Sequence, residues 1–438
     1  MRPSPLPTIK MAVKSYTSED AYLKDLASRS ALPEGFKAST AAIRFIPEER
    51  SVGEPLPMNL TLILLDRPTP DFAAVFTRNA FPGAPVLIGR ERLAEPAARG
   101  VLVNTKISNV RAPNGKPDAE GLLDSLGELV GAPARELFAA STGIIGWKLP
   151  VKDMRAALPS LVKGLQAGTI LPAARAIMTT DSFPKVRSAA VGSGSIVGIA
   201  KGAGMMEPNM ATMLCFICTD LAVGREQLRE DLRWCVERTL NRISVDGDQS
   251  TSDMAIALSS GRKPAAAAAD FRRALLEVLS GLAGDIVRNG EGAAHVVRIR
   301  VSGAQSEAAA ADIGKAVANS PLVKTAIYGN DPNVGRIVSA IGDHLGNRGL
   351  SADTEALTIR LGGTEIFSRG AFRLDSEKER ALSGYLREMG FDPTVKGYPK
   401  HDGTVDIDID MGGGSPAVEI LGTDLSYEYV RENADYRS

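Results

Sequence analysis

The chain has 438 residues, 44% of them hydrophobic and 24% charged, which suits a soluble globular protein with one large α/β body or about two to three smaller domains. The formal net charge is −1, so no overall field attracts nucleic acid or an anionic membrane. No apolar run reaches the roughly 18–20 residues of a membrane-spanning helix. We therefore expect a cytoplasmic protein without nucleic-acid or membrane partners.

Cysteine and histidine are scarce, with three residues of each. Three cysteines do not make a secreted disulfide framework. Cys215 and Cys218 have CxxC spacing, but they lie in an apolar run that predicts a buried strand. The histidines, His295, His344 and His401, belong to no nucleophile or zinc motif. These patterns favour buried core cysteines over a metal site, and they disfavour a histidine-based triad.

The first 35 residues are polar and differ in character from the rest of the chain. The first 18 contain Arg2, Lys10 and Lys14 but no acidic residue, and they lack the apolar segment of a signal peptide. Prolines within the first seven residues disfavour an amphipathic helix. We expect residues 1–35 to form a loosely packed or disordered N-terminal extension.

Strands and helices alternate along the rest of the chain, which indicates a layered α/β protein. Before residue 200 the pattern predicts strands at 60–65, 98–104 and 138–146, helices at 120–130 and 151–165, and broken strands within 186–199. After residue 210 it predicts strands at 211–220, 254–258, 296–301, 323–328, 404–411 and 418–421, and helices at 225–243, 271–288, 308–318, 334–341 and 426–432. The glycine-rich loop at 201–210 is the expected internal break.

That loop runs through Ala211-Thr212 directly into an apolar strand. A rigid strand start can fix the Thr212 hydroxyl, and the small Ala211 leaves its carbonyl approachable. If the loop strains this peptide bond, the hydroxyl can attack the carbonyl, and hydrolysis of the ester frees Thr212 as a new N-terminus. Its α-amino group, with a pKa near ~7.7–8.0, could then act as the base for its own hydroxyl. From these residues alone, an ordinary loop entering a strand remains the simpler interpretation.

The segment 201–214 closely resembles the self-cleavage signature of the ornithine acetyltransferase (glutamate N-acetyltransferase) family. More of the family's motifs follow in the family's order: ASTGIIG at 140–146, IMTTD at 177–181, VDGDQST at 245–251, NGEG at 289–292, LVKTA at 322–326, DPNVGR at 331–336 and the segment 424–438. The likeness extends from about residue 35 to the end of the chain. On these motifs the chain is identified as a member of the family.

The resemblance implies roles for individual residues. Thr212 matches the nucleophile and is preceded by the cleavage position at Ala211, while Thr142 and Gly143 match the pair that stabilises the oxyanion. Five further residues, together with Thr212, match substrate-contacting positions: Thr179, Lys201, Glu291, Asn433 and Ser438. Lys201 would hold a substrate carboxylate and Glu291 a substrate ammonium. Asp246 and Asp248 lie among small polar residues that suit a structural turn, and we do not assign them to the site.

Three features depart from the family pattern. Residues 105–110 read TKISNV where an Asn-Ala-Asn-rich loop is usual, and Val334 stands where an aromatic residue is frequent. The N-terminal arm is longer than is typical of the family. These changes leave Thr212 and the oxyanion pair intact. They bear on which acyl donor and acceptor are used.

By resemblance we expect an αββα-type sandwich of the N-terminal-nucleophile kind, made as a single body from an α chain over 36–211 and a β chain over 212–438 that pair into α2β2. The implied reaction is ping-pong transfer of acetyl from N2-acetylornithine to glutamate in arginine biosynthesis. It needs no metal or cofactor, although acetyl-CoA is a possible donor. Three alternatives stay open: an amidohydrolase or aminopeptidase on the same fold, an acetyltransferase of a specialised pathway, and a binding protein that never cleaves.

Overall fold

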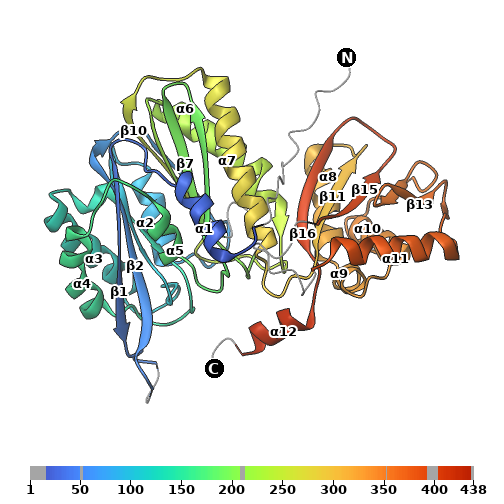
Figure 1. Cartoon of the computed structure of the whole chain (residues 1–438), viewed down its shortest axis with the longest axis horizontal. Coiled ribbons are helices and arrows are strands. Elements are labelled where there is room, and N and C mark those ends of the chain that lie inside the picture. Colours follow the sequence, from blue (N-terminus) through green and yellow to red (C-terminus); the bar gives the residue numbers. More distant parts are fainter. Residues whose placement is uncertain (1–15, 50–52, 208–212, 352, 392–402, 436–438) are drawn as a thin grey trace.

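The computed structural model describes residues 16–49, 53–207, 213–351, 353–391 and 403–435. In this part of the chain, two layered α/β bodies lie side by side (Figure 1). The first contains two sheets and the elements from α1 to α7 except strand β9, and the second is built on one larger sheet that includes β9.

Two stacked sheets make up the first body. One has the strand order β1-β2-β4-β5, formed by β1 (Phe36–Phe45), β2 (Leu56–Thr69), β4 (Ala98–Asn104) and β5 (Leu137–Ser141). The other has the order β3-β10-β8-β7-β6, formed by β3 (Phe72–Phe76), β10 (Met254–Lys263), β8 (Leu214–Leu221), β7 (Gly194–Lys201) and β6 (Lys185–Val191). Strands β5 and β8 are buried along their whole length. Because successive side chains of a strand point to opposite faces, each sheet is covered on both faces.

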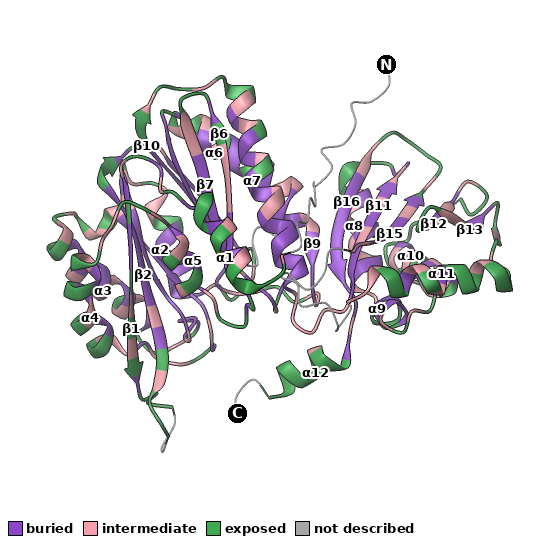
Figure 2. Cartoon of the chain, viewed as in Figure 1, coloured by how far each residue is buried: buried purple, intermediate pink, exposed green. Residues whose placement is uncertain are grey.

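Three apolar clusters hold these layers together. Phe36, Phe138 and Phe216 belong to the core between the sheets. The outer face of the first sheet packs on α3 (Gly115–Val130) and α4 (Val151–Lys163), and that of the second on α6 (Arg225–Arg238) and α7 (Ala268–Arg288). Figure 2 shows the strands mostly buried and the outward sides of these helices exposed. The arrangement is the αββα sandwich expected from the sequence.

Three more helices add apolar side chains to the core between the sheets: α1 (Glu19–Ser28), α2 (Ala84–Arg92) and α5 (Leu171–Ala176). In α1, Tyr22 and Leu26 are buried, and the Tyr22 hydroxyl donates to the carbonyl oxygen of Pro184 at 2.8 Å. The loosely packed extension predicted for residues 1–35 therefore contains, where it is described, a helix integrated into the sandwich. Residues 1–15 lie outside the described residues.

The second body is a seven-stranded sheet of order β14-β13-β12-β15-β11-β16-β9. Its strands are β9 (Ile243–Ser244), β11 (Val296–Ser302), β12 (Thr358–Leu361), β13 (Thr364–Ser368), β14 (Ala371–Phe372), β15 (Val405–Asp410) and β16 (Ala417–Thr423). One apolar cluster joins it to α8 (Glu307–Asn319), α9 (Pro321–Tyr328), α10 (Val334–Asn347) and α11 (Ser376–Met389). The last helix, α12 (Tyr427–Ala434), follows β16 and buries none of its residues.

Several features differ from the sequence-based expectation. The predicted strand at 323–328 is wrong, because this segment belongs to helix α9. The single body is also wrong: there are two bodies, and the chain contributes strand β9 to the second body's sheet before β10 and α7 of the first. The loop at 201–210 joins β7 to β8, which pair in one sheet with Lys201 opposite Leu214, so it is not a boundary between bodies.

The cysteines of the CxxC pair are core residues, as predicted. Cys215 and Cys218 on β8 are buried and contribute to clusters on opposite faces of the sheet. Burial raises the pKa of Cys215 to about 12, so its thiol is neutral and unreactive. Among the described residues, no helix is long and apolar enough to cross a bilayer.

Candidate functional site

A pocket of about 300 Å³ lies in the sandwich where the ends of several strands meet. Thr142 and Gly143 enter it directly after β5, Lys201 from the end of β7, and Met213 from just before β8. The segment that precedes β10, residues 250–253, completes one wall.

The pocket gathers the predicted site residues from segments far apart in the sequence. Those described all line it: Thr142, Gly143, Thr179, Lys201, Glu291 and Asn433. Ala211, Thr212 and Ser438 lie outside the described residues. Met213, the residue after the predicted nucleophile, is itself part of the lining, and its carbonyl oxygen accepts from the Met254 amide at 2.9 Å.

A buried asparagine, Asn104, organises the turn that carries the predicted oxyanion pair. Its amide nitrogen donates to the carbonyl oxygens of Thr105 and Ile107 at 3.2 and 2.8 Å, and its Oδ1 accepts from the Ser141 hydroxyl at 2.7 Å. The Thr142 amide donates to the Asn104 carbonyl oxygen at 3.1 Å. The Asn104 side chain therefore joins the backbone of residues 105–107 to the Ser141 hydroxyl beside Thr142, a function that sequence reasoning missed.

The conformation of Gly143 is one that other residues rarely adopt. Its φ is +129°, and a Cβ placed there would lie 2.2 Å from the carbonyl carbon of Lys106. Only glycine lets the two backbone segments approach so closely. This explains physically why the turn needs glycine at position 143.

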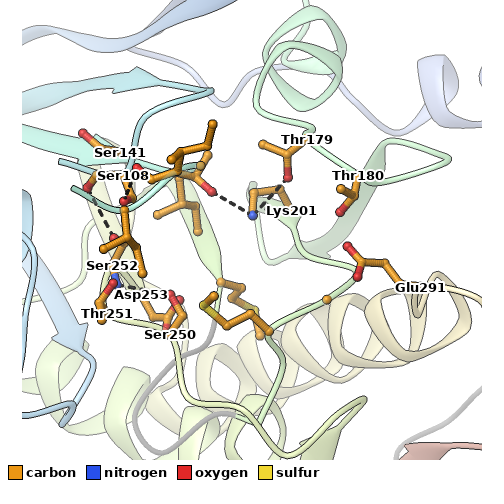
Figure 3. A pocket seen from close by; sticks show the side chains of 18 of the residues that line it. Ser108, Ser141, Thr179, Thr180, Lys201, Ser250, Thr251, Ser252, Asp253 and Glu291 are labelled. Carbon is orange, nitrogen blue, oxygen red and sulfur yellow. Dashed lines mark hydrogen bonds between the residues drawn. The ribbon is translucent and has the colours of Figure 1, made fainter. Parts of the chain in front are cut away.

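Lys201 connects the turn to the Thr179 segment. Its Nζ donates to Thr142 Oγ1 at 2.9 Å and to Thr179 Oγ1 at 3.3 Å (Figure 3). These two hydroxyls hold the ammonium group in the pocket without neutralising it. Lys201 is thus placed to attract a carboxylate.

A buried ion pair beneath the pocket holds this arrangement in place. Asp181 accepts from Lys185 Nζ at 2.5 Å, from the Gly202 amide at 2.8 Å and from the Thr179 amide at 3.1 Å. Burial acts to raise the pKa of Asp181, but Lys185, Lys201 and the Gly202 amide outweigh it and hold that pKa below its usual value. The ionised Asp181 therefore fixes the backbone beside both Thr179 and Lys201.

Glu291 supplies the opposite charge. Its amide donates to the Ala203 carbonyl oxygen at 3.0 Å, and its Oε2 accepts from Asn433 Nδ2 on α12 at 3.0 Å. A Cβ at Gly204 would lie 2.1 Å from the same oxygen, so a larger residue at 204 would displace the carboxylate. The pocket therefore offers one cation and one anion to a ligand.

Neither the residues of one pocket wall nor Asp246 was assigned to the site from the sequence. Ser108, Ser250, Thr251, Ser252 and Asp253 line the wall seen on the left of Figure 3. Asp246, which the sequence analysis left out of the site, accepts from the amides of Met205 and Met206 at 2.6 Å each. It fixes the loop that leads to the predicted cleavage position, so its turn is structural, as predicted, but it also shapes the pocket wall.

Within the described residues, neither a histidine nor a metal cluster takes part in the pocket. No histidine of the described residues lines the pocket, and these residues contain no group of three or more His, Cys, Asp or Glu side chains arranged to hold a metal ion. The chemistry available in the described part of the pocket comes from hydroxyls, backbone amides, Lys201, Glu291 and Asp253.

Fold and pocket together define a class: an αββα sandwich with a polar cavity at its strand ends, suited to a small molecule that carries both charges. The model of the ArgJ family matches residues 52–438, and the chain belongs to that family.

Its relatives match over nearly their whole length. The arginine biosynthesis bifunctional protein ArgJ of Nitratidesulfovibrio vulgaris is 40% identical, and the match covers 93% of this chain and 100% of that protein. Glutamate N-acetyltransferase Oat2 of Streptomyces clavuligerus is 36% identical, with coverage of 92% and 98%. The crystal structure of the argJ protein from Bacillus halodurans is 33% identical, covers 50% of this chain and 98% of that chain, and has a TM-score of 0.44.

Proposed function

We propose that this protein is a self-cleaving N-acetyltransferase of arginine biosynthesis that moves an acetyl group from N2-acetylornithine to glutamate. The observation that carries the proposal is the convergence of six predicted site residues on one pocket that also includes Met213, the neighbour of Thr212. The names of the relatives, an arginine biosynthesis bifunctional protein and a glutamate N-acetyltransferase, support the same activity.

In the proposed maturation step, the Thr212 hydroxyl oxygen attacks the carbonyl carbon of Ala211. The hydroxyl proton passes to the Thr212 nitrogen, the amide bond breaks and an ester forms. Water then hydrolyses the ester, which leaves a carboxylate on Ala211 and a free amino group on Thr212. Because β7 and β8 pair along their length, the two fragments would stay joined within one sheet, as the proposed α2β2 assembly requires.

In the proposed transfer, the new amino group takes the proton of the Thr212 hydroxyl, whose oxygen attacks the acetyl carbonyl. Donors at Thr142 and Gly143 would stabilise the developing oxyanion, and ornithine leaves with the proton. The amino nitrogen of glutamate then attacks the acetyl ester, N-acetylglutamate departs and the hydroxyl is regenerated. Lys201 would bind the α-carboxylate shared by both substrates, and Glu291 the ornithine ammonium. Acetyl-CoA could replace the donor in the first half-reaction.

Thr212→Ala tests the nucleophile. We expect wild-type protein to yield a fragment beginning Thr-Met-Leu-Cys by intact mass and N-terminal sequencing, and the variant to remain full length and transfer no acetyl group. Thr212→Ser, which keeps a hydroxyl, should retain both activities at a lower rate. Acetyl transfer by the alanine variant, or the absence of that fragment from wild-type protein, would overturn the proposal.

The same assay separates the alternatives. N-acetylglutamate formed faster than free acetate supports the transferase. Acetate as the main product would assign an amidohydrolase. A donor and acceptor screen in which another amino acid outcompetes glutamate would place the enzyme in a specialised pathway.

A further inference from the structure

The pocket contains a carboxyl group to which the proposed mechanism gives no task. Asp253 lies between the serine-rich segment 250–252 and β10, and its side chain lines the pocket. Only 4% of the residue is exposed. Figure 3 places it on the side of the pocket away from Lys201 and Glu291.

One of the two oxygens of the buried Asp253 carboxyl group, Oδ2, has no hydrogen-bond partner in the described part of the chain. A buried and unpartnered polar atom carries a desolvation cost, and such atoms require an explanation. Because Asp253 lines the pocket, a ligand bound there is a direct source of the missing partner.

The position of Asp253 brings this group close to the predicted reaction centre. Met254 pairs with Leu214 in the parallel β10–β8 register, and the Met254 amide donates to the Met213 carbonyl oxygen at 2.9 Å. Asp253 therefore directly precedes a residue that is hydrogen-bonded to the neighbour of Thr212. Its backbone is fixed on the other side by the Thr77 amide, which donates to the Asp253 carbonyl oxygen at 3.0 Å.

We propose that Asp253 is a further substrate-contacting residue, whose carboxyl group donates a hydrogen bond to the oxygen of the uncharged secondary amide of the acyl donor. The inference rests on the proposed function, because Lys201 and Glu291 are taken there to bind the charged ends of the donor. Neither of these residues binds the amide, whose oxygen the proposed oxyanion donors Thr142 and Gly143 would also face.

The surroundings of Asp253 favour its protonated form. Burial raises its pKa well above the usual value, while the Ser250 hydroxyl and the charge of Lys201 oppose this effect without cancelling it. Lys201 and Glu291 are the other titratable groups among the described residues of the pocket lining. A neutral carboxylic acid can donate a hydrogen bond, and it does not attract the cationic end of the ligand.

Three variants test this role. Asp253→Asn keeps a neutral donor of the same shape, and kcat/KM for acetylornithine should fall by no more than about threefold. Asp253→Ala removes the donor, and kcat/KM should fall by about tenfold or more. Asp71→Asn makes the same change at another carboxyl whose pKa is raised by burial but which lies outside the pocket lining, and it should have no effect. An asparagine variant as impaired as the alanine variant would overturn the proposal.

The pH profile gives a readout that a purely structural role would not change. If Asp253 must stay protonated, wild-type activity falls as the pH rises through the pKa of this group, and Asp253→Asn should lose that alkaline limb. The acid limb, set by the proposed amino base, should be unchanged. An alkaline limb that persists unchanged in the asparagine variant counts against the proposal.

An infrared difference spectrum between wild type and Asp253→Asn separates this inference from the transferase proposal. It should contain the carbonyl stretch of one protonated carboxyl group, perturbed when acetylornithine is added. This band does not depend on turnover. Its absence would refute the protonated Asp253 even in an active transferase. Its presence in a protein that transfers no acetyl group would instead place the failure in the proposed function.

Discussion

At the scale of single residues, the oxyanion turn gives the sharpest expectation. Gly143→Ala would press a Cβ against the Lys106 backbone at a φ of +129°, so the turn must shift. We expect a loss of about 100- to 1,000-fold in kcat, the effect of losing one oxyanion donor. Gly146→Ala is the matched control, because Gly146 also has positive φ but a Cβ there meets nothing within 4 Å. It should cost only about 1 kcal/mol of stability and leave transfer intact, as steady-state kinetics and thermal unfolding would show.

The sequence located the residues that form the pocket better than those that support them. Thr142, Lys201 and Glu291 lie in short motifs that could be matched directly. Asn104 and Asp181 act through hydrogen bonds to backbone groups of other segments, and no local pattern encodes such contacts. Asp253 was missed for a related reason: its burial and its unpartnered oxygen are properties of the folded chain alone.

At the scale of elements, the turn at 245–248 clamps the loop that leads to the predicted cleavage position. The Asp246 carboxylate accepts from two consecutive amides of that loop, and the Glu207 amide donates to the Asp248 carbonyl oxygen at 2.9 Å. The Tyr429 hydroxyl on α12 also donates to Asp246, at 3.3 Å, so one carboxylate joins the loop to the helix that carries Asn433.

Asp246→Asn replaces one of these acceptor oxygens with a donor, so one loop amide loses its partner. Hydrogen bonds to charged groups contribute about 1.5–3 kcal/mol, so we expect self-cleavage to slow by about tenfold or more. The time course of fragment formation in freshly purified precursor, followed by intact mass, measures this rate. Asp248→Asn makes the same change at a neighbouring exposed side chain and should cleave normally. Equal rates for both variants would show that the clamp does not control cleavage.

Element types were predictable wherever the apolar period was long, and helix α9 shows where it was not. Its eight residues are too short for a helical period to stand out from a strand. The informative signal was its start: Ser320 caps the helix by accepting from the Val323 amide, and Pro321 occupies the first turn. Side-chain apolarity outweighed these two residues in the sequence-based prediction.

At the scale of the whole molecule, the two bodies are joined by more than the chain between them. Strand β9, which precedes β10 in sequence, pairs with β16 at the edge of the second body's sheet. Beside it, the buried Lys324 of α9 donates to the carbonyl oxygens of Val245 and Thr423 at 2.7 and 2.6 Å. The sequence-based expectation of a single body came from the family resemblance. The division depends on which strands pair, and pairing partners far apart in sequence leave no local mark.

Lys324 makes the stability of this junction depend on pH. Burial lowers its pKa to about 8, against about 10.4 in an unfolded chain, with Asp424 and Asp246 only partly opposing the shift. Between these values the unfolded state binds more protons than the folded state, so the free energy of unfolding contributed by this group rises with pH, by roughly 3 kcal/mol across the window. The free energy of unfolding, measured by urea denaturation at about pH 7.5 and about pH 9.5, should increase more for wild type than for Lys324→Met, which has no proton to lose. Lys315→Met, at a lysine of α8 that is only partly buried, is the control and should keep the wild-type increase. Equal increases for wild type and Lys324→Met would mean that Lys324 titrates at the same pH in both states, and the junction would then owe its pH dependence to other groups.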